Sequence, residues 1–147
     1  MRLNWQTTED YAEAIVNGLH AALAQTPRDH LRQLSDIIAY DTDPLGARLG
    51  VYIRDRSGTR IELYLQPHLE LIGRDRRLQR LEVAEYSRAI VLQLAHTLYH
   101  EIGHHLTLTL NPRKKPSRKR PAVSDTLETW AEQYAAKRLE KFSQSRS

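Results

Sequence analysis

The chain has 147 residues and a formal net charge of +4, with 40% hydrophobic and 27% charged residues. This size and composition fit one globular domain with a sizeable core, and they exclude global disorder. Because the chain contains no cysteine, disulfide scaffolds, thiolate zinc sites, iron–sulfur clusters and cysteine nucleophiles are excluded as well.

Membrane insertion is not expected, because the apolar stretches fall far short of the ~20 residues that a membrane span needs. The first residues, 1–6, do not resemble a signal peptide, so we expect a cytoplasmic protein. The positive charge comes from one segment, residues 112–121, and the other 16 basic residues are outnumbered by 18 acidic ones. The net charge therefore does not by itself indicate nucleic-acid binding.

The first half of the chain predicts a helix followed by a small sheet. Hydroxyl and acidic residues at 7–10 are typical of a helix start, and apolar residues then recur at helical spacing as far as Pro27. A short helical turn around 29–33 and a strand over 35–40 follow. The clearest strands are the alternating segments 49–53 and 61–65, which a turn-forming loop joins into a hairpin.

The second half predicts two helices separated by a basic loop. Pro67 is expected to end the second hairpin strand, and residues 73–80 to form a connection. A long helix is predicted from about Glu82 to about Leu106, and a last helix from about Ser124 to about Phe142. Residues 112–121 form the loop between them, and residues 143–147 a frayed tail. This order predicts a single α+β domain over residues 1–147.

The residues His100-Glu101-Ile102-Gly103-His104 match the pattern H-E-x-x-H. Residues four apart lie on one helix face, about a turn apart, so the two imidazoles can bind one zinc ion. The glutamate after the first histidine would lie beside the metal, where it can take a proton from a bound water. We therefore predict that His100 and His104 bind Zn²⁺ and that Glu101 is the general base.

The rest of this helix favours a cleft over the histidines. Its apolar residues form a stripe on roughly the opposite side: Val91, Leu94, Ala95, Leu98 and Ile102. Gly103, a poor helix former, suggests that another element packs closely there. His105 is expected to be buried and hydrogen-bonded. His96 lies too far along the helix from His104 to share its ion.

A catalytic zinc ion needs a third protein ligand, and the acidic residues downstream are the candidates: Asp125, Glu128, Glu132 and Glu140. Glu128 lies within or beside the apolar stripe of the last helix, Glu132 at its edge and Glu140 on the far side. Glu128 has a second interpretation, because Asp125 and Glu128 have the spacing of a capping box. We favour the ligand, since a carboxylate on an inward face needs a partner.

Residues 98–106 resemble the active-site helix of zincin metallopeptidases. Residues 128–135 resemble the downstream glutamate helix of the gluzincin branch, which includes thermolysin-like enzymes, ImmA/IrrE-type peptidases and minigluzincins. In that branch the first glutamate is the third zinc ligand, which implies Glu128. The residue four positions on, usually Asp or Asn, supports a zinc-binding histidine, and here it is Glu132. Thr107 stands where some zincins have glycine, so a metzincin-like third ligand is not implied.

The resemblance implies a minimal zincin-like domain with a small antiparallel sheet, an active-site helix and a C-terminal ligand helix. In zincins an edge strand beside the active-site helix pairs with extended substrate, and either residues 49–53 or residues 61–65 would serve. His105 and Tyr134 are further candidates to support the reaction, as donors to the developing oxyanion.

The sequence therefore predicts a zinc metalloendopeptidase acting on peptide or protein substrates. One alternative is a regulatory or binding module that carries zinc but cleaves little. Another is a nucleic-acid-associated protein that uses the basic segment 112–121. That segment has no interleaved aromatic residues to stack on bases, so a solvated loop is favoured. The functional interpretation is contact with an acidic substrate or with nucleic-acid phosphates, and the place of the segment between the two ligand-bearing elements would also suit a lid.

Overall fold

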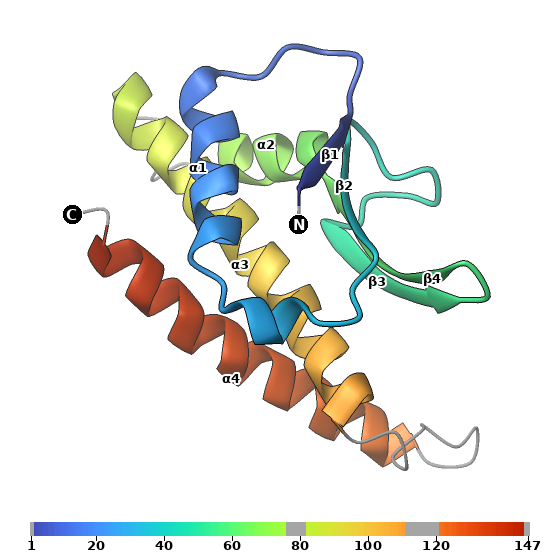
Figure 1. Ribbon diagram of the computed structural model, residues 1–147. Helices are drawn as coiled ribbons and strands as arrows, with labels where there is room; N and C mark the ends of the chain where they lie inside the picture. Colours follow the sequence, from blue (N-terminus) through green and yellow to red (C-terminus); the bar gives the residue numbers. More distant parts are fainter. Residues whose placement is uncertain (1, 76–81, 111–120, 146–147) are drawn as a thin grey trace.

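The computed structural model describes residues 2–75, 82–110 and 121–145, with the backbone alone for residues 110 and 121–125. Its elements follow in the order shown in Figure 1: β1 (Leu3–Gln6), α1 (Glu13–Ala24), the 3-10 helix η1 (Arg28–Leu31), β2 (Asp36–Tyr40), β3 (Gly50–Asp55), β4 (Gly58–Tyr64), α2 (Leu65–Arg74), α3 (Val83–Leu110) and α4 (Pro121–Ser145). This content confirms the predicted α+β class.

Within the described residues, four strands form one sheet in the order β1-β2-β4-β3. The pairs β1–β2 and β2–β4 are parallel, and only the predicted hairpin, β3–β4, is antiparallel. The sheet is therefore mixed rather than antiparallel. A hairpin is visible in a local pattern, whereas a parallel pair joins segments far apart in the chain through a crossover, here α1 between β1 and β2.

The N-terminal segment differs from the prediction in two ways. Residues 3–6 form a strand, which is too short to show an alternating pattern, and the helix begins at Glu13 rather than near Thr8. Asp41, at the end of β2, explains the later start. Its carboxylate accepts hydrogen bonds from the backbone and hydroxyl of Thr8, both at 2.7 Å, and from the Tyr11 hydroxyl at 2.6 Å. The expected capping residues are thereby bound to another element.

Helix α2 is an element that the sequence analysis missed. Pro67 does not end a strand but is the third residue of this helix. A proline is tolerated in the first turn, because the backbone N–H groups there have no partner within the helix. The side chains of Leu65, His68 and Ile72 are buried at helical spacing. Residues 73–75 belong to this helix and its end, whereas residues 76–81 lie outside the described residues.

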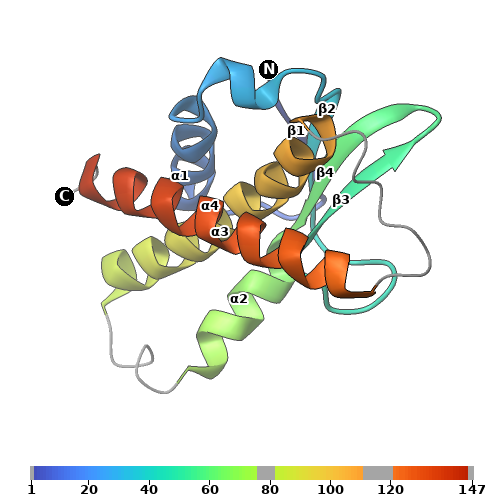
Figure 2. The same cartoon turned by 90° about the horizontal axis from the view of Figure 1, so that it is seen from below.

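Helix α3 is the centre of the fold, packed by α1, α2 and α4 and by strands β3 and β4 (Figures 1 and 2). It extends to Leu110, four residues beyond the predicted end. The predicted apolar stripe is confirmed, since every member is at least 98% buried: Val91, Leu94, Ala95, Leu98 and Ile102. The opposite side of the helix is therefore free to carry polar groups.

Helix α4 crosses α3 (Figure 2), and its C-terminal half also meets the end of α1, where Arg138 donates a hydrogen bond to the carbonyl oxygen of Gln25. It begins at Pro121, before the predicted start, so Asp125 lies inside the helix and cannot be its cap. The capping-box interpretation of Glu128 is therefore wrong. The helix also continues to Ser145, whose hydroxyl accepts a hydrogen bond from Gln25, so residues 143–145 are not a frayed tail. The basic segment 112–120 lies outside the described residues.

The close crossing of α3 and α4 depends on Gly103. A β-carbon at this position would lie 2.9 Å from the α-carbon of Ala131 and 3.2 Å from its carbonyl oxygen. The prediction that another element packs closely against Gly103 is thus confirmed, and the element is α4. This contact brings the polar face of α3 against the acidic residues of α4.

Candidate metal centre

Two histidines of α3 face each other on its polar side. The Nε2 atoms of His100 and His104 are 3.2 Å apart, and the two rings meet edge to face at 84°. Both side chains are largely buried, with 15% and 19% exposed. Burial lowers the pKa of His104, which favours the neutral imidazole, the form that binds metals.

Glu128 of α4 completes the group. One carboxylate oxygen lies 3.1 Å from Nε2 of His100, and the other lies 2.8 Å from Nε2 of His104. The Glu128 side chain is 54% exposed, so its contacts with both histidines, rather than the cost of burial, support its role. Among the described residues, these three form the one group of histidine and acidic side chains close enough to hold a metal ion.

The geometry and chemistry of this group fit zinc. A tetrahedral zinc ion holds nitrogen and oxygen ligands at about 2.0–2.2 Å, which places neighbouring ligand atoms about 3.3 Å apart. The observed separations of 2.8, 3.1 and 3.2 Å are close to that value. Two histidines and one carboxylate are also a typical donor set for a catalytic zinc ion, which keeps its fourth position open.

Glu132, one turn further along α4, lies behind His100. Its carboxylate oxygens lie 2.5 Å from Nδ1 of His100 and 3.3 Å from Nε2 of His96. The close contact with His100 is not aligned as a hydrogen bond, since that Nδ1 atom has no hydrogen-bond partner. Glu132, where the gluzincin pattern usually has Asp or Asn, therefore places a carboxylate beside the ring of a candidate ligand. His96 is the second contact of this carboxylate.

Glu101 lies beside the histidines and contacts strand β3 at Tyr52. It is 8% exposed, and burial raises its pKa to about 7, while a hydrogen bond from the Tyr52 backbone N–H opposes that rise. A cavity of about 360 Å³ opens here, lined by residues of β3 together with Glu101, His104 and Glu128. A buried carboxylate with a raised pKa beside an open cavity is suited to taking up and releasing a proton.

The unpaired edge of strand β3 lies beside this cavity. It is the outermost strand of the sheet, and the backbone N–H of Tyr64 donates to Leu49 at 3.0 Å. In an antiparallel pair, only every second residue of a strand bonds to the neighbouring strand. Because Leu49 bonds to Tyr64 at the end of β4, Gly50 and Tyr52 direct their main-chain groups away from β4. Of the two candidate strands, residues 49–53 therefore have the free edge, whereas residues 61–65 contribute to β4 inside the sheet.

His105 and Tyr134 are engaged away from the histidine pair. His105 is fully buried, as expected, with Nε2 2.7 Å from the carbonyl oxygen of Arg32 and Nδ1 2.9 Å from the Tyr52 hydroxyl. The hydroxyl of Tyr134 lies 2.8 Å from Nδ1 of His30 on η1. His105 thus has a partner at each ring nitrogen, and the Tyr134 hydroxyl is paired as well. Neither residue is therefore placed to donate to the oxyanion.

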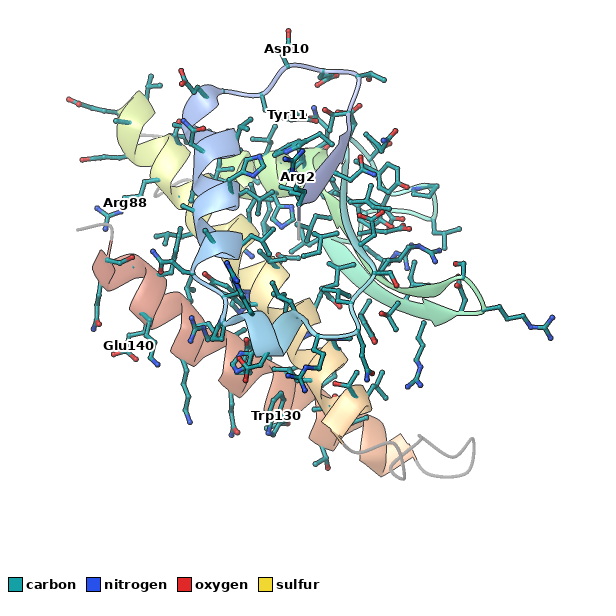
Figure 3. The ribbon with its side chains drawn as sticks, viewed as in Figure 1. Arg2, Asp10, Tyr11, Arg88, Trp130 and Glu140 are labelled. Atoms are coloured by element: carbon teal, nitrogen blue, oxygen red, sulfur yellow. The ribbon has the colours of Figure 1, made fainter. Side chains whose placement is uncertain are left out.

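The sequence left open which of the two hairpin strands lies beside Glu101, and no pattern in it indicated the contact of His96 with Glu132. Tyr52 had one visible signal, its position in an alternating strand, but nothing in that pattern indicates that its N–H meets Glu101. Glu140, the rejected candidate ligand, is exposed and points away from α3 (Figure 3).

Comparison with models of protein families, with curated proteins and with solved structures finds no match to this chain. The resemblance to gluzincins therefore rests on the residues described above. In the part of the chain that the structure describes, no helix has the length and apolar character needed to cross a membrane. The cytoplasmic location stays a prediction.

Proposed function

We propose that the protein is a zinc-dependent metallopeptidase of the gluzincin type, which cleaves peptide bonds in peptides or proteins. The observation that carries the proposal is the convergence of His100, His104 and Glu128, on two helices, next to the buried carboxylate of Glu101. His100, His104 and Glu128 would hold the ion. Bound zinc lowers the pKa of a coordinated water and polarises the carbonyl group of the substrate.

The substrate would bind as an extended strand along β3. The outward main-chain groups of Gly50 and the carbonyl of Tyr52 are available to pair with a peptide, because β3 lies at the edge of the sheet. Such pairing would hold the scissile carbonyl over the cavity that Glu101 and His104 line. Main-chain pairing orients the peptide without requiring a particular side chain.

Glu101 would act first as a base and then as an acid. Its carboxylate accepts a proton from the attacking water and delivers that proton to the nitrogen of the leaving amine. The Tyr52 N–H holds the carboxylate at the edge of β3, so the same strand would position both the base and the substrate. Glu132 would support His100 through the carboxylate that it places beside Nδ1.

Glu101→Gln tests the proposal, because it keeps the shape of the side chain and removes the base. We expect the purified variant to retain zinc while its turnover of a broad peptide library falls by ~10²-fold or more. Glu140→Gln, an exposed change on α4, is the matched control and should retain full activity.

Two results would contradict the proposal. One is a Glu101→Gln variant as active as the wild type. The other is a wild-type protein that binds zinc stoichiometrically and cleaves no peptide in the library, which would favour the regulatory or binding module instead.

A further inference from the structure

A second cavity, of about 630 Å³, lies between α1, η1 and the start of β1. Its apolar walls are formed by Leu3, Leu23 and Leu31, one from each of these elements. None of its lining residues belongs to the candidate metal centre. Its volume lies within the range of small-molecule sites, which combine apolar walls with a few polar groups of fixed chemistry.

The charged and aromatic groups of this cavity are hydrogen-bond donors. Arg2, which precedes β1, and Arg28, the first residue of η1, both line it, and a guanidinium group has five donors and no acceptor. His20 lines it as well, and its Nε2 atom lies 3.1 Å from the indole nitrogen of Trp5. Because an indole N–H can only donate, neutral His20 carries its proton on Nδ1 and is a donor there.

Among the described residues, no acidic side chain lines the cavity to balance these donors. Other arginines of the chain are paired: Arg48 with Asp43, and Arg60 with Asp55 and Glu62. In the part of the chain that the structure describes, no ion pair joins Arg2 or Arg28 to a carboxylate. Both side chains are exposed, so their guanidinium groups can exchange solvent for a ligand.

We propose that this cavity binds a small organic anion, a carboxylate or a phosphate monoester, whose charged group is held by Arg2 and Arg28. Arginine binds both groups through paired hydrogen bonds, since its planar fork matches their oxygen atoms. The apolar part of the ligand would pack against Leu3, Leu23 and Leu31. This site goes beyond the proposed peptidase function, because it shares no residue with the metal centre and does not require metal.

The proposal is tested with hexanoate and hexyl phosphate, which share an apolar chain and differ in the anion, and with hexanol as the uncharged analogue. The reporter is the indole N–H resonance of Trp5, which is assigned with Trp130→Phe because the chain has two tryptophans. We expect at least one anion to shift this resonance saturably below ~10 mM, and hexanol to leave it unchanged. Whichever anion saturates identifies the charged group.

Substitutions separate the site from general charge effects. Arg2→Gln and Arg28→Gln should each weaken binding by about tenfold or more, with unchanged zinc content. Arg88→Gln is the control, because this exposed arginine lies on α3, far from Arg2 (Figure 3). The inference is overturned if neither anion saturates, if hexanol binds as well as the anions, or if both cavity variants bind like the wild type.

Discussion

The close crossing of α3 and α4 makes Gly103→Ala the sharpest test of how the metal centre is assembled. The added methyl group would lie 2.9 Å from a backbone atom of Ala131, whereas ordinary contacts begin at 3.4 Å. The obstacle is backbone rather than the end of a flexible side chain, so the two helices must separate by about 0.5 Å. Glu128, one turn before Ala131, would move with α4, away from both histidines.

The expected effects on stability and on zinc binding differ in size. Replacing a helical glycine by alanine stabilises a helix by about 1 kcal/mol, and overpacking costs about 1–3 kcal/mol. The free energy of unfolding without metal should therefore change little or fall by up to about 2 kcal/mol. A shift of about 0.5 Å exceeds the ~0.2 Å tolerance of metal–ligand distances, so zinc affinity should fall by at least about tenfold.

Zinc affinity is measured by competition with a chromogenic chelator, and stability by denaturant unfolding with and without zinc. Gly73→Ala is the matched control, because a β-carbon there would meet only the Tyr86 hydroxyl, at 3.3 Å. That variant should keep the wild-type zinc affinity. A Gly103→Ala variant that binds zinc as tightly as the wild type would show that the close helix crossing does not position Glu128.

Three further predictions follow from single contacts. Glu132→Gln removes the charge beside His100 and should weaken zinc binding by about 10- to 100-fold, while Glu140→Gln should not; equal affinities would contradict a supporting role for Glu132. Burial lowers the pKa of His68 from 6.5 to about 4, so unfolded chains take up a proton that the folded protein excludes. Stability should then fall as the pH drops from 6.5 to about 4, by roughly 3 kcal/mol. His68→Gln should flatten that pH profile relative to the wild type in metal-free denaturant titrations, and parallel profiles would contradict this origin. Chelation of the metal should accelerate hydrogen exchange in α4 and leave α1 unchanged, because α1 packs on α3 without the ligands; unaltered exchange in α4 would show that its docking does not depend on the metal.

The sequence determined the parts of this protein that depend on local periodicity. The apolar stripe of α3 and the alternation of the hairpin strands each repeat within one element, so the sequence reveals them without knowledge of any neighbour. The pair His100 and His104 is of the same kind, because a spacing of four places two side chains on one helix face whatever packs against it.

Tertiary structure decided everything that joins distant segments. The parallel pairing of β1 with β2 and the late start of α1, fixed by Asp41, depend on residues about 30 positions apart. The choice of Glu128 over the other acidic residues depends on where α4 crosses α3, which the contact of Gly103 with Ala131 sets. The meeting of the β3 edge with Glu101 depends instead on the packing of α3 against that strand. Local propensity specifies which face of an element is apolar, but only packing selects the element that this face meets.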